Sequence, residues 1–147
     1  MKKNIYLIKI IILSLFFSTN LFAGKSDIFD MGKNLFEKKE FDKSKIYFER
    51  DIVFNPMSEK SYLYLAKIFL HNENDSEEEK NLNNVLTLNP ENDEAVYMLT
   101  LLKIKQTNYD EAKKLMDKFN LICESFCIKK NEIKEKFSEL IPQNEKN

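Results

Sequence analysis

The sequence predicts an all-α fold built from a repeated pair of helices. Of its 147 residues, 43% are hydrophobic and 32% are charged, a balance typical of one folded domain. Two glycines and three prolines are too few turn residues for the many short strands of a sandwich or barrel. Apolar residues recur instead at helical spacing, and this pattern itself repeats along the chain.

Residues 1–23 have the layout of a secretory signal peptide. Lys2 and Lys3 precede a short apolar stretch over residues 5–17, and the small residue Ala23 stands before Gly24. We expect cleavage between Ala23 and Gly24, which would place the protein in the periplasm or outside the cell. The alternative is a retained N-terminal membrane anchor. The apolar stretch is shorter than the roughly 20 residues of a spanning helix, so we expect no stable membrane insertion after cleavage.

Composition argues against several classes of function. Removal of the first 23 residues takes three lysines and leaves 20 basic against 24 acidic residues, a net charge of −4. Nucleic acid is therefore not an expected partner, because phosphate binding requires a basic surface. The single histidine, His71, and the scarcity of glycine remove most catalytic, cofactor-binding and metal-binding signatures. The sequence predicts no enzyme, no cofactor and no metal site.

The internal repeat has a period of 34 residues, the interval between Asn55-Pro56 and Asn89-Pro90. It defines three repeats over 25–58, 59–92 and 93–126, each predicted to form two helices. Asp75 with Glu78, and Asn108 with Glu111, have the three-residue spacing of helix starts. One more amphipathic helix is expected over 126–141, as a cap on a domain spanning 24–141, followed by a polar tail over 142–147. The apolar positions of the first helices include Ile28, Met31, Gly32, Leu35, Tyr62, Leu65, Ala66, Phe69, Val96, Leu99 and Leu102.

This pattern resembles the tetratricopeptide repeat (TPR). The resemblance rests on Gly32 and Ala66 as small contact residues of the first helices, on aromatic residues that open the second helices, and on the junction prolines. It implies a right-handed α-solenoid of antiparallel helix pairs. Five residues depart from the family pattern: Ser44 and Glu78 replace alanine, Asp75 replaces an aromatic residue, Lys103 replaces an aromatic residue or leucine, and Glu124 replaces the closing proline.

The resemblance also implies a concave groove, lined by the first helices, that receives a peptide or protein segment. Apolar anchors with interspersed lysines would suit an amphipathic helix or an extended segment with some acidic residues. An alternative is that the protein's own capping helix or tail fills part of the groove. Carried onto this chain, the groove would consist of Phe29, Lys33, Phe36, Leu63, Lys67, Leu70, Tyr97, Leu101 and Ile104.

Cys123 and Cys127 bracket the third junction, the one without proline. An exported chain reaches a compartment in which disulfides persist, so a structural bridge that holds the capping helix is expected. Two buried free thiols are the alternative. Redox or metal chemistry has less support, because the spacing is not that of a C-x-x-C motif and a zinc site would lack two ligands.

The function expected from these observations is that of an exported protein-interaction module with an unidentified protein or peptide partner. The alternative is a structural envelope protein that self-associates as a homo-oligomer through exposed helix faces, including those of Ile46, Tyr47 and Val53.

Overall fold

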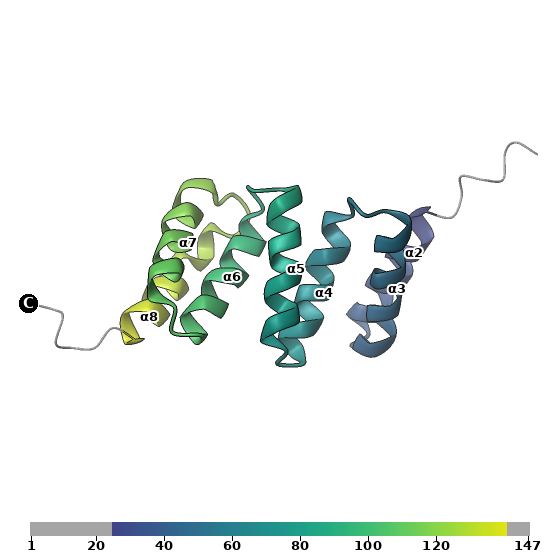
Figure 1. Ribbon diagram of the computed structural model, residues 1–147, viewed down its shortest axis with the longest axis horizontal. Coiled ribbons are helices and arrows are strands. Elements are labelled where there is room, and N and C mark those ends of the chain that lie inside the picture. The colour runs from purple at the N-terminus through teal and green to yellow at the C-terminus, as the bar shows by residue number, and fades with distance from the viewer. Residues whose placement is uncertain (1–24, 141–147) are drawn as a thin grey trace, which may run out of the picture. The chain divides into compact units, whose positions relative to one another are not determined.

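The computed structural model describes residues 25–140, and no strand occurs among them (Figure 1). The all-helical fold class is therefore confirmed. The predicted signal peptide and polar tail lie outside the described residues. The helices are α2 (Lys25–Glu37), α3 (Phe41–Phe54), α4 (Glu59–His71), α5 (Asp75–Leu88), α6 (Asp93–Lys105), α7 (Tyr109–Ile122) and α8 (Lys130–Leu140), with a 3-10 turn η1 (Cys127–Lys129) before the last.

The chain divides into two compact units, with the boundary between Asn55 and Pro56. The N-terminal unit holds the helix pair α2 and α3, and the C-terminal unit holds α4 to α8. Within each predicted repeat the two helices pack closely on one another, as α2 on α3, α4 on α5, and α6 on α7. None of the helices within 25–140 is long and apolar enough to cross a membrane.

A close helix contact explains why Gly32 suits the N-terminal unit. A Cβ built on Gly32 would lie 2.8 Å from a ring carbon of Phe48, a separation that real side chains do not adopt. The Ser44 hydroxyl donates a hydrogen bond of 2.8 Å to the Gly32 carbonyl, so this serine is fully buried but satisfied. The small residue expected from the repeat pattern therefore lets α3 approach the backbone of α2.

Each helix pair turns through the same left-handed residue. Lys39, Glu73 and Thr107 have φ values of 61°, 55° and 58°, and they lie 34 residues apart. The amide after each one bonds back to the carbonyl five residues earlier, as in the 2.9 Å bond from Glu40 N to Leu35 O. This is the Schellman ending of a helix, which glycine usually supplies. No glycine occupies these three turns.

Asparagine side chains begin the helices of the C-terminal unit. Asn74, Asn92 and Asn108 accept hydrogen bonds from the amides of Glu77, Ala95 and Glu111, at 3.2, 2.8 and 3.4 Å. The prediction of a cap at Asn108 is thus confirmed. The prediction that Asp75 begins α5 is wrong by one residue, because Asn74 takes that position and the Asp75 carboxylate binds Lys105 Nζ at 2.6 Å.

The core of the C-terminal unit is centred on α6. Nine of its residues are buried, and α5, α7 and α8 all pack against it. Ile133 of α8 is fully buried in the same cluster, together with Leu82, Ala112 and Phe119. The last helix therefore completes the core, as a repeat array requires of its end.

Candidate functional site

A cavity of about 470 Å³ opens on the C-terminal unit and contains part of the predicted groove. The first helices α4 and α6 supply most of its lining, and α5 and α8 supply the rest. Four residues predicted from sequence meet here: Leu70, Tyr97, Leu101 and Ile104. The remaining lining residues are Glu78, Met98, Leu102, Lys105, Lys136 and Glu139.

The predicted groove residues of this unit separate into core and surface. Leu63, Tyr97 and Ile104 are buried in the hydrophobic core, with exposed fractions of 9%, 9% and 5%. Leu70 is 50% exposed and Leu101 is half-buried. The cause is the position of α6, which has helices on several sides and buries residues that a single-sided groove helix would leave open. Leu70 and Leu101 thus form the accessible apolar part of the cavity.

Helix α8 covers one side of Tyr97. The Tyr97 hydroxyl donates a 2.9 Å hydrogen bond to Glu132 Oε1, and Lys129 Nζ lies 5.6 Å from the ring centroid. Burial, and then the neighbouring Glu132, raises the pKa of Tyr97 above its usual value. The bonds from Lys129 and Tyr97 lower the pKa of Glu132. The capping helix therefore lies beside the predicted groove face, as the alternative interpretation expected.

Lys67 takes part in internal contacts. Its Nζ lies 2.8 Å from Glu94 Oε1 and 5.0 Å from the ring centroid of Tyr64. Both members of the ion pair are about a quarter exposed. Lys67 therefore links α4 to α6 on a partly open surface.

The three groove residues predicted on α2 belong to the N-terminal unit. Phe29 packs on Phe48 with ring centroids 5.6 Å apart, and Phe36 packs edge-on against Phe41 at 5.2 Å. Both phenylalanines are half-buried against α3, whereas Lys33 is exposed and lies 3.8 Å from Glu37. The cavity described above does not include these residues; the C-terminal unit alone forms it.

Glu78 is a cavity residue that the groove prediction missed. Its exposed fraction is 2%, and its Oε2 atom has no hydrogen-bond partner. Burial, reinforced by the charge of Asp75 and opposed by that of Lys105, raises the pKa of Glu78 to about 7. The repeat register held the signal, because residues 44 and 112, at the same repeat position, are a serine and an alanine that are both fully buried.

A second buried charge, Lys103, is fully paired. Its Nζ binds Glu79 at 2.6 Å and lies 3.6 Å from Glu111 Oε2. Glu79 also accepts a bond of 3.1 Å from Gln106, and Lys103, the first-named cause, lowers the pKa of Glu79. These contacts join α5, α6 and α7 at a position where the family pattern has an apolar residue. Lys103 is thus satisfied, in contrast to Glu78.

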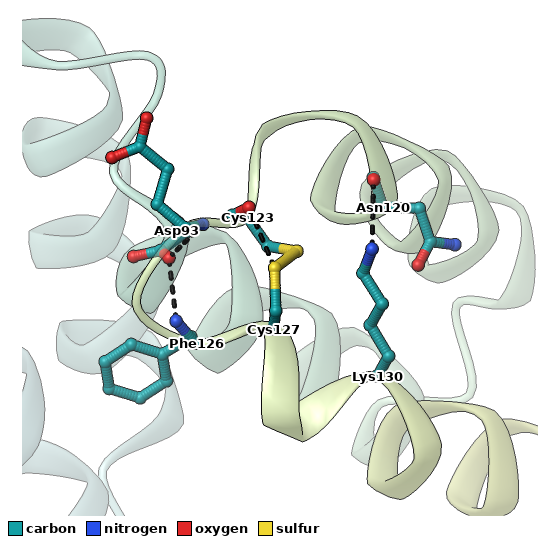
Figure 2. The surroundings of a disulfide bond; sticks show 7 residues. Asp93, Asn120, Cys123, Phe126, Cys127 and Lys130 are labelled. Atoms are coloured by element: carbon teal, nitrogen blue, oxygen red, sulfur yellow. Dashed lines mark hydrogen bonds between the residues drawn. A yellow bond between two sulfur atoms is a disulfide. The ribbon is translucent and has the colours of Figure 1, made fainter.

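The cysteines lie at the junction between α7 and the capping helix, as Figure 2 shows. Their sulfur atoms are 2.08 Å apart, the distance of a disulfide bond. Cys123 ends α7 in an extended conformation and Cys127 begins η1, so the pair spans a turn rather than an intact helix. Cys127 Sγ also lies 2.8 Å from the Cys123 carbonyl oxygen, a close contact without a donor, because a bridged sulfur carries no proton.

The same junction is bound to the start of α6. Asp93 Oδ2 accepts hydrogen bonds from the backbone amides of Glu124 and Phe126, at 2.8 and 2.9 Å (Figure 2). Lys130 Nζ donates a 3.3 Å bond to the Asn120 carbonyl across the turn. The junction is thus held by hydrogen bonds in addition to the sulfur pair. Within residues 25–140, no group of three histidine, cysteine, aspartate or glutamate side chains is arranged to hold a metal ion.

Comparison with known proteins identifies the fold. No protein family model matches the sequence, and no curated protein matches it either. Among solved structures, the chain is similar to the first TPR domain of Spaghetti (RPAP3) bound to the HSP90 peptide SRMEEVD, with 14% identity, a TM-score of 0.72, and coverage of 80% of this chain and 94% of that one. It is also similar to the TPR2B domain of yeast Sti1 in its complex with pHsp70, with 16% identity, a TM-score of 0.72, and coverage of 78% and 96%.

A third similar structure is the Sgt2 TPR domain from Aspergillus fumigatus, with 14% identity, a TM-score of 0.67, and coverage of 80% and 81%. The chain therefore has the fold of TPR domains, the class to which its 34-residue period pointed.

Proposed function

We propose that this protein is an exported protein-interaction module that binds a peptide or protein segment through the cavity of its C-terminal unit. The observation that carries this proposal is an open cavity between first helices with an exposed apolar residue, Leu70, beside it. Structures with the same fold are described as complexes with HSP90 and HSP70 peptides. Exposed apolar anchors flanked by charged groups are typical of sites that recognise protein segments.

The central experiment uses peptides selected from a random display library on the wild-type protein. Replacement of Leu70 by glutamate adds a charge beside the cavity, and it should weaken the selected peptides at least tenfold in a fluorescence anisotropy titration. Leu121→Glu is the matched control, because Leu121 is 86% exposed and does not line the cavity. The control should bind normally.

Both variants should retain the helical circular dichroism and melting temperature of the wild type. Equal peptide affinity in Leu70→Glu and wild type would contradict the assignment of the cavity. Unfolding of Leu70→Glu would mean that Leu70 belongs to the core. Failure of any peptide to bind would argue against the interaction module.

Export is the second part of the proposal, and it rests on residues 1–23, whose pattern is that of a signal peptide. The mature chain should begin at Gly24 or a close neighbour. Intact-mass measurement of the protein from the producing cell tests this. A membrane-bound species that retains Met1 would instead support the N-terminal anchor.

Self-association is a second candidate because α3 exposes a group of apolar side chains. Ile46, Val53 and Phe54 have exposed fractions of 63%, 76% and 58%. Such residues can pack symmetrically in a homo-oligomer. Size-exclusion chromatography with light scattering distinguishes the two functions, since a module that acts alone should elute as a monomer at micromolar concentration.

A further inference from the structure

Glu78 occupies a position that the repeat otherwise gives to a small residue. Ser44 and Ala112 lie 34 residues before and after it, and both are fully buried where two helices meet. The serine satisfies its hydroxyl on the Gly32 carbonyl, and alanine has nothing to satisfy. Glu78 brings a carboxylate to the same place, and its Oε2 atom bonds to nothing.

A buried, unpartnered carboxylate destabilises a fold, since it loses hydration and gains no hydrogen bond. Residues that break a local rule without compensation are most often found at functional sites. Glu78 lies in the lining of the cavity and not in a closed part of the core. A ligand entering the cavity can therefore supply the partner that the protein itself does not.

The charges around Glu78 leave room for a cation. Lys105 of α6, the nearest basic lining residue named in its electrostatic environment, is held by Asp75 at 2.6 Å. Helix α8 contributes one lysine and one glutamate, Lys136 and Glu139, both at the exposed side of the cavity. Helix α4 contributes the apolar Leu70. Glu78 is thus an acidic group without a local counter-ion bond, in a lining that is otherwise mostly apolar.

We propose that the cavity receives a lysine or arginine side chain of the bound segment, with its aliphatic part against Leu70 and Leu101 and its cationic end on the Glu78 carboxylate. This inference rests on the proposed function and specifies the chemistry of its ligand. Long basic side chains combine an apolar stem with a charged end, which matches a lining that is apolar at the opening and acidic inside. A charge-assisted hydrogen bond would satisfy the open Oε2 position.

Binding of this kind is linked to protonation. The free protein holds the pKa of Glu78 at about 7 through burial and the charge of Asp75, against the influence of Lys105. A bound cation favours the ionised carboxylate. Affinity for a basic side chain should therefore fall as the pH is lowered from 8 to 5.5, because the carboxylate then takes up a proton. Tyr97, Lys105, Lys136 and Glu139, the other titratable lining residues, have ordinary values outside this range.

The test uses three acetylated and amidated tripeptides on the full chain, followed by nuclear magnetic resonance of backbone amides. The peptides are Leu-Lys-Leu, Leu-norleucine-Leu and Leu-Glu-Leu, which differ only in the central side chain. The lysine peptide should bind at least tenfold more tightly than the norleucine peptide at pH 8, and the glutamate peptide should bind least. The largest shifts should fall on amides around Glu78 and Leu101.

Glu78→Ala and Glu78→Gln provide the decisive variants. Alanine is the residue at the equivalent position 112, so Glu78→Ala should fold with a higher melting temperature while it loses the preference for lysine over norleucine. Glu78→Gln should lose the same preference with little change in size.

Equal affinity for the lysine and norleucine peptides would overturn the inference, as would a preference for lysine that survives in both variants. If display-selected peptides bind through Leu70 but show no dependence on Glu78, the inference fails while the interaction module stands. If no peptide binds through Leu70, the proposed function itself fails.

Discussion

Two junctions of the C-terminal unit occupy the same place in successive repeats and are fastened by different chemistry. The first follows α5 at residues 89–92, and the second follows α7 at residues 123–126, 34 positions later. In both, the first residue of the repeat's own first helix is acidic and reaches the junction. Glu59 accepts the side-chain amides of Asn89 and Asn92, at 3.1 and 2.5 Å. Asp93 accepts backbone amides instead.

This comparison explains the missing proline of the third repeat. Pro90 and Glu124 are equivalent positions, and proline has no backbone N–H to donate. The Glu124 amide donates to Asp93 at 2.8 Å, so the departure from the family pattern supplies a bond that proline would remove. The second junction thus replaces a proline and two asparagines with backbone bonds and a sulfur pair. The shared element is the acid at the start of the first helix.

Removal of the Asp93 carboxylate should have the largest effect on this comparison. Asp93→Ala leaves two backbone amides without their acceptor and removes a favourable charge from the first turn of α6, so we expect a loss of about 2–3 kcal/mol in unfolding free energy. Chemical denaturation measures it. Asp110→Ala, which removes an exposed first-turn charge from α7, is the control and should cost about 0.5 kcal/mol.

The Asp93 effect should also depend on pH. Burial acts to raise the pKa of Asp93, but bonds from the backbone amides, Phe126 foremost, bring it below the ordinary value of 3.8. A lowered folded-state pKa stabilises the protein above pH 3.8, and this contribution is lost as the pH falls through the folded-state value. The difference between wild type and Asp93→Ala should therefore shrink below pH 3.8. A constant difference down to pH 2 would contradict the ionic role.

Loss of the sulfur bridge should have the next largest effect. The loop is only five residues long, so chain entropy limits the global stabilisation to about 1–2 kcal/mol. The double variant Cys123→Ser with Cys127→Ser should exchange its amides faster from residue 129 to residue 140, with α4 and α5 little changed. Alkylation of the native, unreduced protein is the direct check. Full labelling of both cysteines would show that no bridge forms.

The proline comparison makes a third prediction. Glu124→Pro removes the amide that binds Asp93, so it should cost about 1 kcal/mol, whereas Glu124→Ala keeps the amide and should be nearly neutral. Cys123 is already extended, at φ −61° and ψ 133°, as a residue before proline must be. Thermal melts of the two variants distinguish them. A stable Glu124→Pro variant would mean that the Glu124 amide bond contributes nothing.

The smallest effect is expected at the first junction. Glu59→Ala frees two asparagine side chains that can turn toward water, so the cost should be about 0.5 kcal/mol, well below that of Asp93→Ala. Denaturant midpoints of the two variants give the ratio. Equal costs would show that side-chain and backbone donors fasten the junctions equally well.

The sequence predicted those features that depend on local spacing. The 34-residue period and helical stripes sufficed for the fold class, and the break in the proline pattern drew attention to Cys123 and Cys127. Features that depend on long-range packing were beyond it. The bond from Tyr97 to Glu132 joins residues 35 positions apart, and periodicity alone could not show that α8 covers this tyrosine.

Glu78 shows how register carries information that composition hides. As one of three successive glutamates near a helix start, it looked like part of a solvated acidic turn. Its equivalence to Ser44 and Ala112 indicated a buried position, but the missing bond at Oε2 required coordinates. Lys103 broke the same pattern, yet α5 and α7 supply partners for it that the spacing of the sequence did not reveal.

The three left-handed turns have a consequence for engineering. Lys39, Glu73 and Thr107 each pay a conformational penalty that glycine would avoid, and the β-branched Thr107 is the least suited of them. Each is exposed and lies at the far end of its helix pair from the junctions. The protein can therefore be made more heat-resistant at three evenly spaced, surface-accessible sites, which would offset the loss of stability from variants designed to probe its binding surface.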